Sequence, residues 1–220
     1  PSMEVAIDEA LKQNKFVEGT ICYTGEITDT SRNYTLKYYV DMAKELQKMG
    51  CHSVAIKDMS GLLKPYSAKV LVSGLKDALD IPVHLHTHDT TGNQVATTLM
   101  AAEAGVDIAD LAISSMSSLT SQPSMNAVVA ALEGQERDTG LSMMDLQKLT
   151  DYWADVRERY VDFESDLKTP VTDIYRYEIP GGQYTNLKPQ VESLNLGHRF
   201  LEVKEMYKKV NDMLGDIVKV

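Results

Sequence analysis

The sequence has 220 residues, of which 22 are Lys or Arg and 32 are Asp or Glu, so its formal net charge at pH 7 is −10. Hydrophobic residues make up 43% and charged residues 25%, which is typical of a folded globular protein and argues against a disordered chain. The acidic balance, without a basic cluster, argues against a nucleic-acid partner or an anionic membrane surface. No apolar run reaches about 18 residues, so the sequence predicts no membrane-spanning segment.

Short apolar or β-branched runs alternate with amphipathic stretches of helical length along the first part of the chain. The sequence predicts a helix at 4–15 and four strands at 17–24, 53–57, 82–86 and 108–113. A helix is expected after each strand, at 36–49, 66–79, 93–104 and 123–132. Strand starts recur about every 25–35 residues, which is the spacing of βαβ units that build parallel sheets.

The pattern changes after Gly134. We expect a long helix at 143–160, a loop at 164–187, a last helix at 199–214 and an apolar, strand-like end at 216–220. The sequence therefore predicts two parts, namely βα units over residues 1–135 and a mostly helical part over residues 136–220.

Four βα units leave the architecture open. They suit an open doubly wound sheet, or half of a parallel barrel, which needs eight strands and typically about 250 residues. The chain starts within an expected helix and stops on an apolar segment, which favours a piece of a larger protein.

Three histidines alternate at the third predicted strand, at His84, His86 and His88. Alternate side chains of an extended backbone point to one face, and imidazoles at positions i and i+2 can converge on one metal ion. We expect His86 and His88, which lie nearer the end of the strand, to be metal ligands, with Asp89 orienting one of them. The alternative is a set of hydrogen-bonded or solvent-facing histidines without a metal.

Lys57 ends the second predicted strand, next to Asp58. An ammonium group has no lone pair and repels a cation, so Lys57 could join a metal site only when deprotonated or converted by CO2 to a carbamate. The residues by themselves favour the simpler interpretation, a lysine that extends its ammonium group to solvent at a strand end. Asp58 competes as a ligand, but alternation points it to the opposite face of the strand.

Three further features of the sequence do not by themselves identify a functional site. The hydroxyl-rich stretch 114–123 suits either a pocket wall that holds an anion or a plain solvated loop. Gly181 and Gly182 suit a simple turn. Cys22 and Cys51 lie in apolar surroundings, and we expect reduced thiols in a reducing compartment, with a disulfide as the alternative.

Four segments of this sequence, at 57–65, 84–90, 120–124 and 178–186, resemble the carboxyltransferase domain of the pyruvate carboxylase family. They occur in the family's order, and the resemblance covers essentially the whole chain. It implies an α/β fold, namely a TIM (β/α)8 barrel that is incomplete in this chain, followed by a C-terminal helical extension that forms a funnel over the barrel mouth.

The resemblance also implies roles for individual residues. Lys57 would be the carbamylated catalytic lysine, and Lys57, His86 and His88 would together hold a divalent metal, zinc or manganese. The family's fourth ligand, an aspartate, and its pyruvate-binding arginine would lie upstream of this chain, and its proton-shuttling threonine directly beyond residues 217–220. We therefore expect the isolated chain to be inactive or nearly so.

The implied reaction transfers a carboxyl group from carboxybiotin to pyruvate and gives oxaloacetate. Biotin would be attached to a carrier domain, and ATP would be used by another domain of the parent enzyme, a homo-oligomer expected to be a tetramer. The compartment would be the bacterial cytoplasm or the mitochondrial matrix. The alternatives are the carboxyltransferase of transcarboxylase or of oxaloacetate decarboxylase, a metal-dependent aldolase-type lyase, and a non-enzymatic piece that serves assembly.

Overall fold

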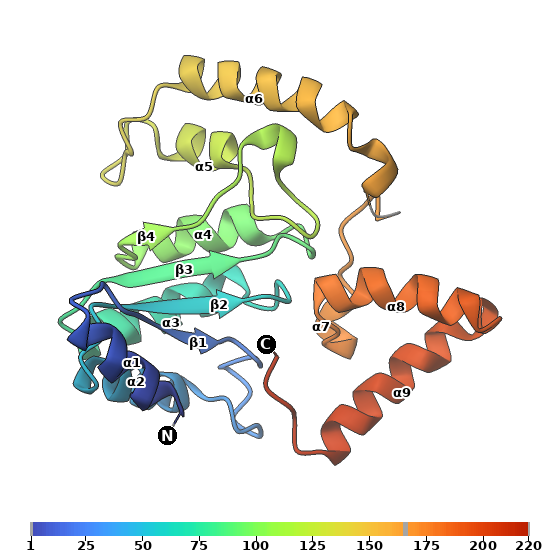
Figure 1. The fold of residues 1–220 in the computed structure, drawn as a ribbon, viewed down its shortest axis with the longest axis horizontal. Helices are drawn as coiled ribbons and strands as arrows, with labels where there is room; N and C mark the ends of the chain where they lie inside the picture. Colours follow the sequence, from blue (N-terminus) through green and yellow to red (C-terminus); the bar gives the residue numbers. More distant parts are fainter. Residues whose placement is uncertain (1, 165–166, 220) are drawn as a thin grey trace.

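The computed structural model describes residues 2–164 and 167–219. These residues form a parallel sheet of four strands in the order β1-β2-β3-β4, with a helical part beside it (Figure 1). The strands are β1 (Glu18–Cys22), β2 (Ser53–Asp58), β3 (Val83–Thr87) and β4 (Ile108–Ala109). Each strand pairs with the next one along the chain, so the sheet consists of successive βα units, as the sequence predicts.

The helices of the βα part lie close to their predicted positions. They are α1 (Ser2–Lys12), α2 (Leu36–Lys48), α3 (Pro65–Ala78), α4 (Gln94–Glu103) and α5 (Met125–Leu132). Helix α3 contacts both α2 and α4, so these three helices form a continuous layer along the sheet. The later helices are α6 (Met143–Glu158), α7 (Ile174–Tyr177), α8 (Gly181–Ser193) and α9 (Phe200–Met213), and single 3-10 turns occur at Ser114–Met116, Val161–Phe163 and Gly197–Arg199.

The hydrophobic core lies between the sheet and this helical layer. Alternate strand residues such as Ile56 and Leu85 are buried there, packed with Leu71 and Leu75 of α3. On β3 the residues between them, including His86, are only half-buried. The period of two therefore places an apolar row against the helices and a polar row on the opposite face of the sheet.

The structure corrects three predicted elements. The predicted loop at 164–187 is wrong in part, because it contains α7 and the first turns of α8. Pro180 and the glycines after it resemble a turn in the sequence, but a proline directly before a helix is compatible with its start. Strand β4 is shorter than predicted and pairs only with β3 within the described residues. Residues 216–219 form no strand, and Val220 lies outside the described residues.

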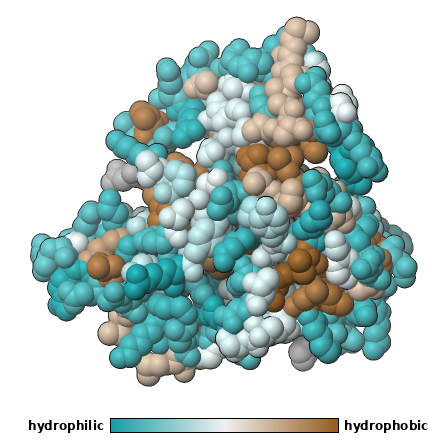
Figure 2. Space-filling view, turned by 180° about the vertical axis from the view of Figure 1, so that it is seen from behind, coloured by the Kyte–Doolittle hydropathy of each residue, from teal (hydrophilic) through white to brown (hydrophobic). Residues whose placement is uncertain are grey.

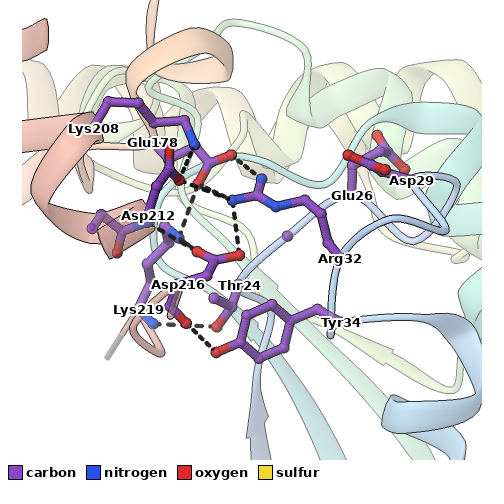
Figure 3. Close-up of polar contacts among 12 residues, drawn as sticks. Thr24, Glu26, Asp29, Arg32, Tyr34, Glu178, Lys208, Asp212, Asp216 and Lys219 are labelled. Carbon is purple, nitrogen blue, oxygen red and sulfur yellow. Dashed lines mark hydrogen bonds and ion pairs between the residues drawn. The ribbon is translucent and has the colours of Figure 1, made fainter. Parts of the chain in front are cut away.

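Charged residues join the C-terminal part to the loop after β1 (Figure 3). Arg32 binds both carboxylate oxygens of Glu178 and lies 2.8 Å from Asp216. Lys219 lies 3.1 Å from Glu178 and 3.1 Å from Asp216, and its backbone N–H donates to Thr24 Oγ1 at 3.2 Å. These side chains are largely buried, so the cluster holds the end of the described chain beside β1.

The remaining features concern the cysteines, the length of the helices and the exposed apolar side chains. Cys22 and Cys51 are both free thiols, as predicted. Within the described residues, no helix has the length and apolar character needed to cross a membrane. Apolar side chains form exposed patches on a mostly hydrophilic surface (Figure 2), and the most exposed large ones include Phe163 and Tyr66.

Candidate metal centre

The candidate residues lie in one row across the sheet. In the parallel register, Cys22 of β1 pairs with Lys57 of β2, and Lys57 pairs with His86 of β3. Register partners in a parallel sheet project from the same face, so Lys57 and His86 are neighbours on the face opposite the helices. His88 follows β3 by one residue and completes the group.

The two imidazoles turn the same nitrogen toward each other. His86 Nε2 and His88 Nε2 are 3.2 Å apart. His86 Nδ1 lies 2.8 Å from Asp110 Oδ2, and His88 Nδ1 lies 2.6 Å from the carbonyl oxygen of Thr120. A carbonyl and an ionised carboxylate only accept hydrogen bonds, so both Nδ1 atoms donate, and a ring in its neutral form then has its lone pair on Nε2.

This arrangement fits a divalent metal. Two nitrogens that bind one tetrahedral zinc ion at about 2.0–2.1 Å are about 3.3 Å apart, close to the observed separation. Without a cation or a proton between them, two such lone pairs would repel each other. The described residues contain no group of three or more His, Cys, Asp or Glu side chains that could hold a metal, so a further ligand would be a residue of another type or would come from outside this chain.

Lys57 is the nearby residue whose chemistry could supply that ligand. Its side chain is half-buried, and its charge acts on His88. Burial lowers the pKa of His88, the charges of His86 and Lys57 lower it further, and the hydrogen bond to Thr120 opposes them. A lowered pKa keeps the His88 ring neutral, which is the form that binds metals.

Asp58 faces away from the row, as its place in the strand predicts, and supports the loop beneath His88. Its carboxylate is buried and accepts hydrogen bonds from the backbone N–H groups of Leu62 at 2.9 Å and Leu63 at 2.8 Å, and from Thr87 Oγ1 at 3.0 Å. Burial raises the pKa of Asp58 to about 6, although these donors favour the charged form. Asp58 therefore anchors the loop after β2 and does not compete with Lys57 as a ligand.

The expected role of Asp89 is wrong. Its Oδ1 accepts the backbone N–H of Gln94 at 3.0 Å, so Asp89 stabilises the start of α4 and does not orient an imidazole. The carboxylate beside an imidazole Nδ1 is that of Asp110, whose Oδ2 lies 2.8 Å from His86. The sequence offered one signal for Asp110, since it is a charged residue within the fourth predicted strand at 108–113, but its distance to His86 depends on the pairing of β3 with β4.

The hydroxyl-rich stretch 114–123 forms a pocket wall. Residues 116–121 line a pocket of about 860 Å³ together with Trp153, Arg157 and Phe163. Thr120, whose carbonyl oxygen accepts from His88, belongs to this wall. The pocket and the histidine pair therefore share one loop.

Two family models together match most of the chain. A model described as HMGL-like matches residues 6–153, and a model described as a conserved carboxylase domain matches residues 174–220. The two matches lie on the βα part and on the end of the helical part.

Curated relatives and solved structures agree with these matches. The chain is 54% identical over 220 residues to pyruvate carboxylase of Staphylococcus aureus, and the match covers 99% of this chain and 19% of that protein. It is 46% identical over 224 residues to mitochondrial pyruvate carboxylase of Rattus norvegicus, with 100% of this chain and 19% of that protein covered. The chain thus spans about a fifth of the length of these relatives.

Among solved structures, the carboxyl transferase domain of Rhizobium etli pyruvate carboxylase matches with a TM-score of 0.96 and 50% identity, covering 99% of this chain and 37% of that chain. The same domain with pyruvate and biocytin matches with a TM-score of 0.95, 50% identity and the same coverage of 99% and 37%. The predicted fold, an incomplete TIM barrel with a helical extension, is confirmed.

Proposed function

Because the chain belongs to the HMGL-like family and corresponds to part of the carboxyltransferase domain of pyruvate carboxylases, we propose that it serves the transfer of a carboxyl group from carboxybiotin to pyruvate, which gives oxaloacetate. The observation that carries this proposal is the 3.2 Å approach of two Nε2 atoms beside Lys57. Identity of 54% to a pyruvate carboxylase favours this reaction over transcarboxylase, oxaloacetate decarboxylase or an aldolase-type lyase.

In this proposal, His86 and His88 hold a divalent cation, zinc or manganese, through their Nε2 atoms. Lys57 would bind as a carbamate: the ammonium group first loses one proton, the Nζ lone pair then attacks CO2, and Nζ loses a second proton, so a negative carboxylate group replaces the ammonium charge. When bound, the cation stabilises negative charge that develops on the pyruvate oxygen. The two rings are held for this task by Asp110 and by the Thr120 carbonyl group, and both acceptors fix Nδ1 as the protonated atom.

We also propose that the chain works within a longer polypeptide, as its relatives are longer. That polypeptide would carry biotin on a carrier domain, use ATP in another domain, and assemble as a homo-oligomer, expected to be a tetramer. The solved relative with pyruvate and biocytin supports pyruvate and a biotin carrier as partners. Relatives from bacteria and a relative described as mitochondrial support a location in the bacterial cytoplasm or in the mitochondrial matrix. The chain by itself would have little activity.

The division into residues 1–135 and 136–220 belongs to the same proposal. The βα part supplies Lys57, His86 and His88, and the helical part would form the funnel above them. The HMGL-like match extends to residue 153 and so continues past residue 135, whereas the match to the conserved carboxylase domain, from residue 174, lies within the helical part.

The test is an assay of the reverse half-reaction in the full-length polypeptide. With oxaloacetate and free biocytin, the enzyme should release pyruvate, which lactate dehydrogenase and NADH detect. Lys57→Ala and His86→Ala should each lower the rate about 100-fold or more, because the charge stabilisation is lost. His198→Ala, a change of an exposed histidine, is the control and should keep the rate.

Pyruvate release that does not depend on biocytin would contradict the proposal. So would full activity in the Lys57 and His86 variants. Cleavage of a lyase substrate by the same preparation, without carboxyl transfer, would favour the aldolase-type alternative.

A further inference from the structure

A series of polar contacts crosses the sheet from Glu18 to His86. Ser53 Oγ donates to Glu18 at 2.7 Å, and both carboxylate oxygens of Glu18 lie 3.1 Å from His84 Nδ1. His84 Nε2 lies 3.0 Å from Asp110 Oδ1, and Asp110 Oδ2 lies 2.8 Å from His86 Nδ1. The contacts connect β1, β2, β3 and the residue after β4.

The position of Asp110 follows from the sheet register. His84 pairs with Ile108 and Leu85 pairs with Ala109, so continuing the register by one residue places Asp110 beside His86. The backbone N–H of Asp110 donates to the carbonyl oxygen of Leu85 at 2.9 Å, which keeps this alignment after the strand ends. Asp110 therefore occupies the row of Lys57 and His86 and lies on the opposite side of His86 from Lys57.

Each oxygen of Asp110 lies near a nitrogen of a different histidine, but only the contact with His86 Nδ1 is a hydrogen bond. His84 is itself held from β1 by Glu18. Ala55 of β2, the register partner of His84, carries only a methyl group, which leaves space for Glu18 to reach across β2. The other Asp110 oxygen is then directed at His86 Nδ1.

We propose that Asp110 is a positioning residue for the metal site. Its carboxylate fixes the proton of His86 on Nδ1 and turns Nε2 toward His88 before a metal arrives. The inference rests on the proposed function, because it concerns the affinity of the same site. Partners of this kind change metal affinity by about 10- to 100-fold.

The experiment measures metal affinity in the full-length polypeptide. The protein is stripped with a chelator and titrated with zinc against a competing dye, and it is then loaded with cobalt(II), whose visible spectrum reports the number and geometry of the ligands. Asp110→Ala should weaken zinc binding at least tenfold and alter the cobalt spectrum. Asp110→Asn, which keeps one acceptor oxygen, should lie between Asp110→Ala and the unmodified protein.

Asp107→Ala is the matched control. Asp107 lies just before β4, and its side chain is 36% exposed, against 43% for Asp110, but it binds Lys76 and the backbone N–H of Val83. Its removal should leave the zinc affinity and the cobalt spectrum unchanged.

The outcomes separate this inference from the proposed function. If the unmodified protein binds zinc and Asp110→Ala binds it equally well with the same cobalt spectrum, the inference is wrong and the site stands. If the unmodified protein binds no zinc or cobalt at His86 and His88, the site and the inference both fail. An equal loss in Asp107→Ala would also overturn the inference, because the effect would then be general.

Discussion

The orientation of His88 depends on the backbone beneath it as well as on Thr120. Gly61 has a positive φ of +67°, and a Cβ atom at this position would lie 2.6 Å from the carbonyl oxygen of His88. The backbone N–H of His88 in turn donates to the carbonyl oxygen of Asp58 at 3.1 Å. Glycine at position 61 therefore lets the loop after β2 touch the end of β3.

Gly61→Ala tests this close approach. The added methyl group has to bear both an unfavourable φ and the contact with His88, so we expect a loss of unfolding free energy of about 2–4 kcal/mol. Gly134→Ala is the control, since Gly134 has a φ of +70° and no atom within 4 Å of its added Cβ. Urea denaturation should show the larger loss for Gly61→Ala, and equal losses would contradict the close contact.

At the scale of elements, α8 begins against the loop that follows the histidines. A Cβ added at Gly181 would lie 2.3 Å from Thr90 Oγ1 and 3.1 Å from Thr90 Cβ. Thr90 is fully buried, and its carbonyl oxygen accepts from Val171 at 2.8 Å. The helical part therefore packs directly on the residues next to His88.

Gly181→Ala should force the start of α8 away from the loop that contains Thr90. Overpacking of this kind costs about 1–3 kcal/mol, and the melting temperature should fall accordingly. Gly182→Ala should have little effect, because nothing lies within 4 Å of a Cβ added at the next position of the same helix. Adding Thr90→Ala to Gly181→Ala removes Oγ1 and should restore part of the stability. No difference between the two glycine variants would contradict the packing.

The same elements show what the sequence could predict. The βα units were predictable because apolar periodicity and glycines such as Gly50 and Gly105 mark where helices end, and because buried strands favour β-branched residues. Helix α8 was not, since Pro180, Gly181 and Gly182 at its start have the composition of a turn.

The sequence likewise predicts some parts of the candidate site and not others. The common face of His86 and His88 follows from the two-residue period of a strand, which the sequence contains. The proximity of Lys57 follows from pairing between successive parallel strands. Asp110 required the exact register of β3 and β4 and the point where β4 ends, and neither can be obtained from a local pattern.

At the scale of the whole molecule, the Arg32 cluster connects the βα part to the end of the chain (Figure 3). Arg32 comes from the loop after β1, whereas Glu178, Asp216 and Lys219 come from the C-terminal part. Side-chain exposures of 18% for Arg32 and 8% for Glu178 make this pair largely buried. Breaking such a pair leaves a charge without its partner in a poorly solvated place.

Arg32→Met should therefore destabilise the fold by roughly 3 kcal/mol, because the buried carboxylates of Glu178 and Asp216 then share Lys219 as their remaining cationic partner in this cluster. The double variant Arg32→Met with Glu178→Gln should lose less than the sum of the two single losses. Thermal unfolding measures all three variants. Additive losses would show that the two side chains are not coupled.

Acid should weaken the same cluster. Burial raises the pKa of Asp216, but hydrogen bonds from Asn211 and Lys219 and the charges of Lys219 and Arg32 outweigh it, so the pKa lies below its ordinary value of 3.8. A lowered folded-state pKa contributes stability that is present above pH 3.8 and is lost as the pH falls through the lowered value. Asp216→Asn should therefore destabilise the protein near pH 7 more than at the acid end, and a constant difference across that range would contradict it.

The central claim is that Lys57, His86 and His88 hold one divalent cation. Anomalous X-ray diffraction at the absorption edges of zinc and manganese, on crystals of the full-length polypeptide, tests it most directly. We expect one anomalous peak about 2.0–2.2 Å from Nε2 of both histidines, with density for a carbamate beyond Lys57 Nζ. A map in which the imidazoles diverge, Lys57 points elsewhere and no peak lies between them would contradict the account.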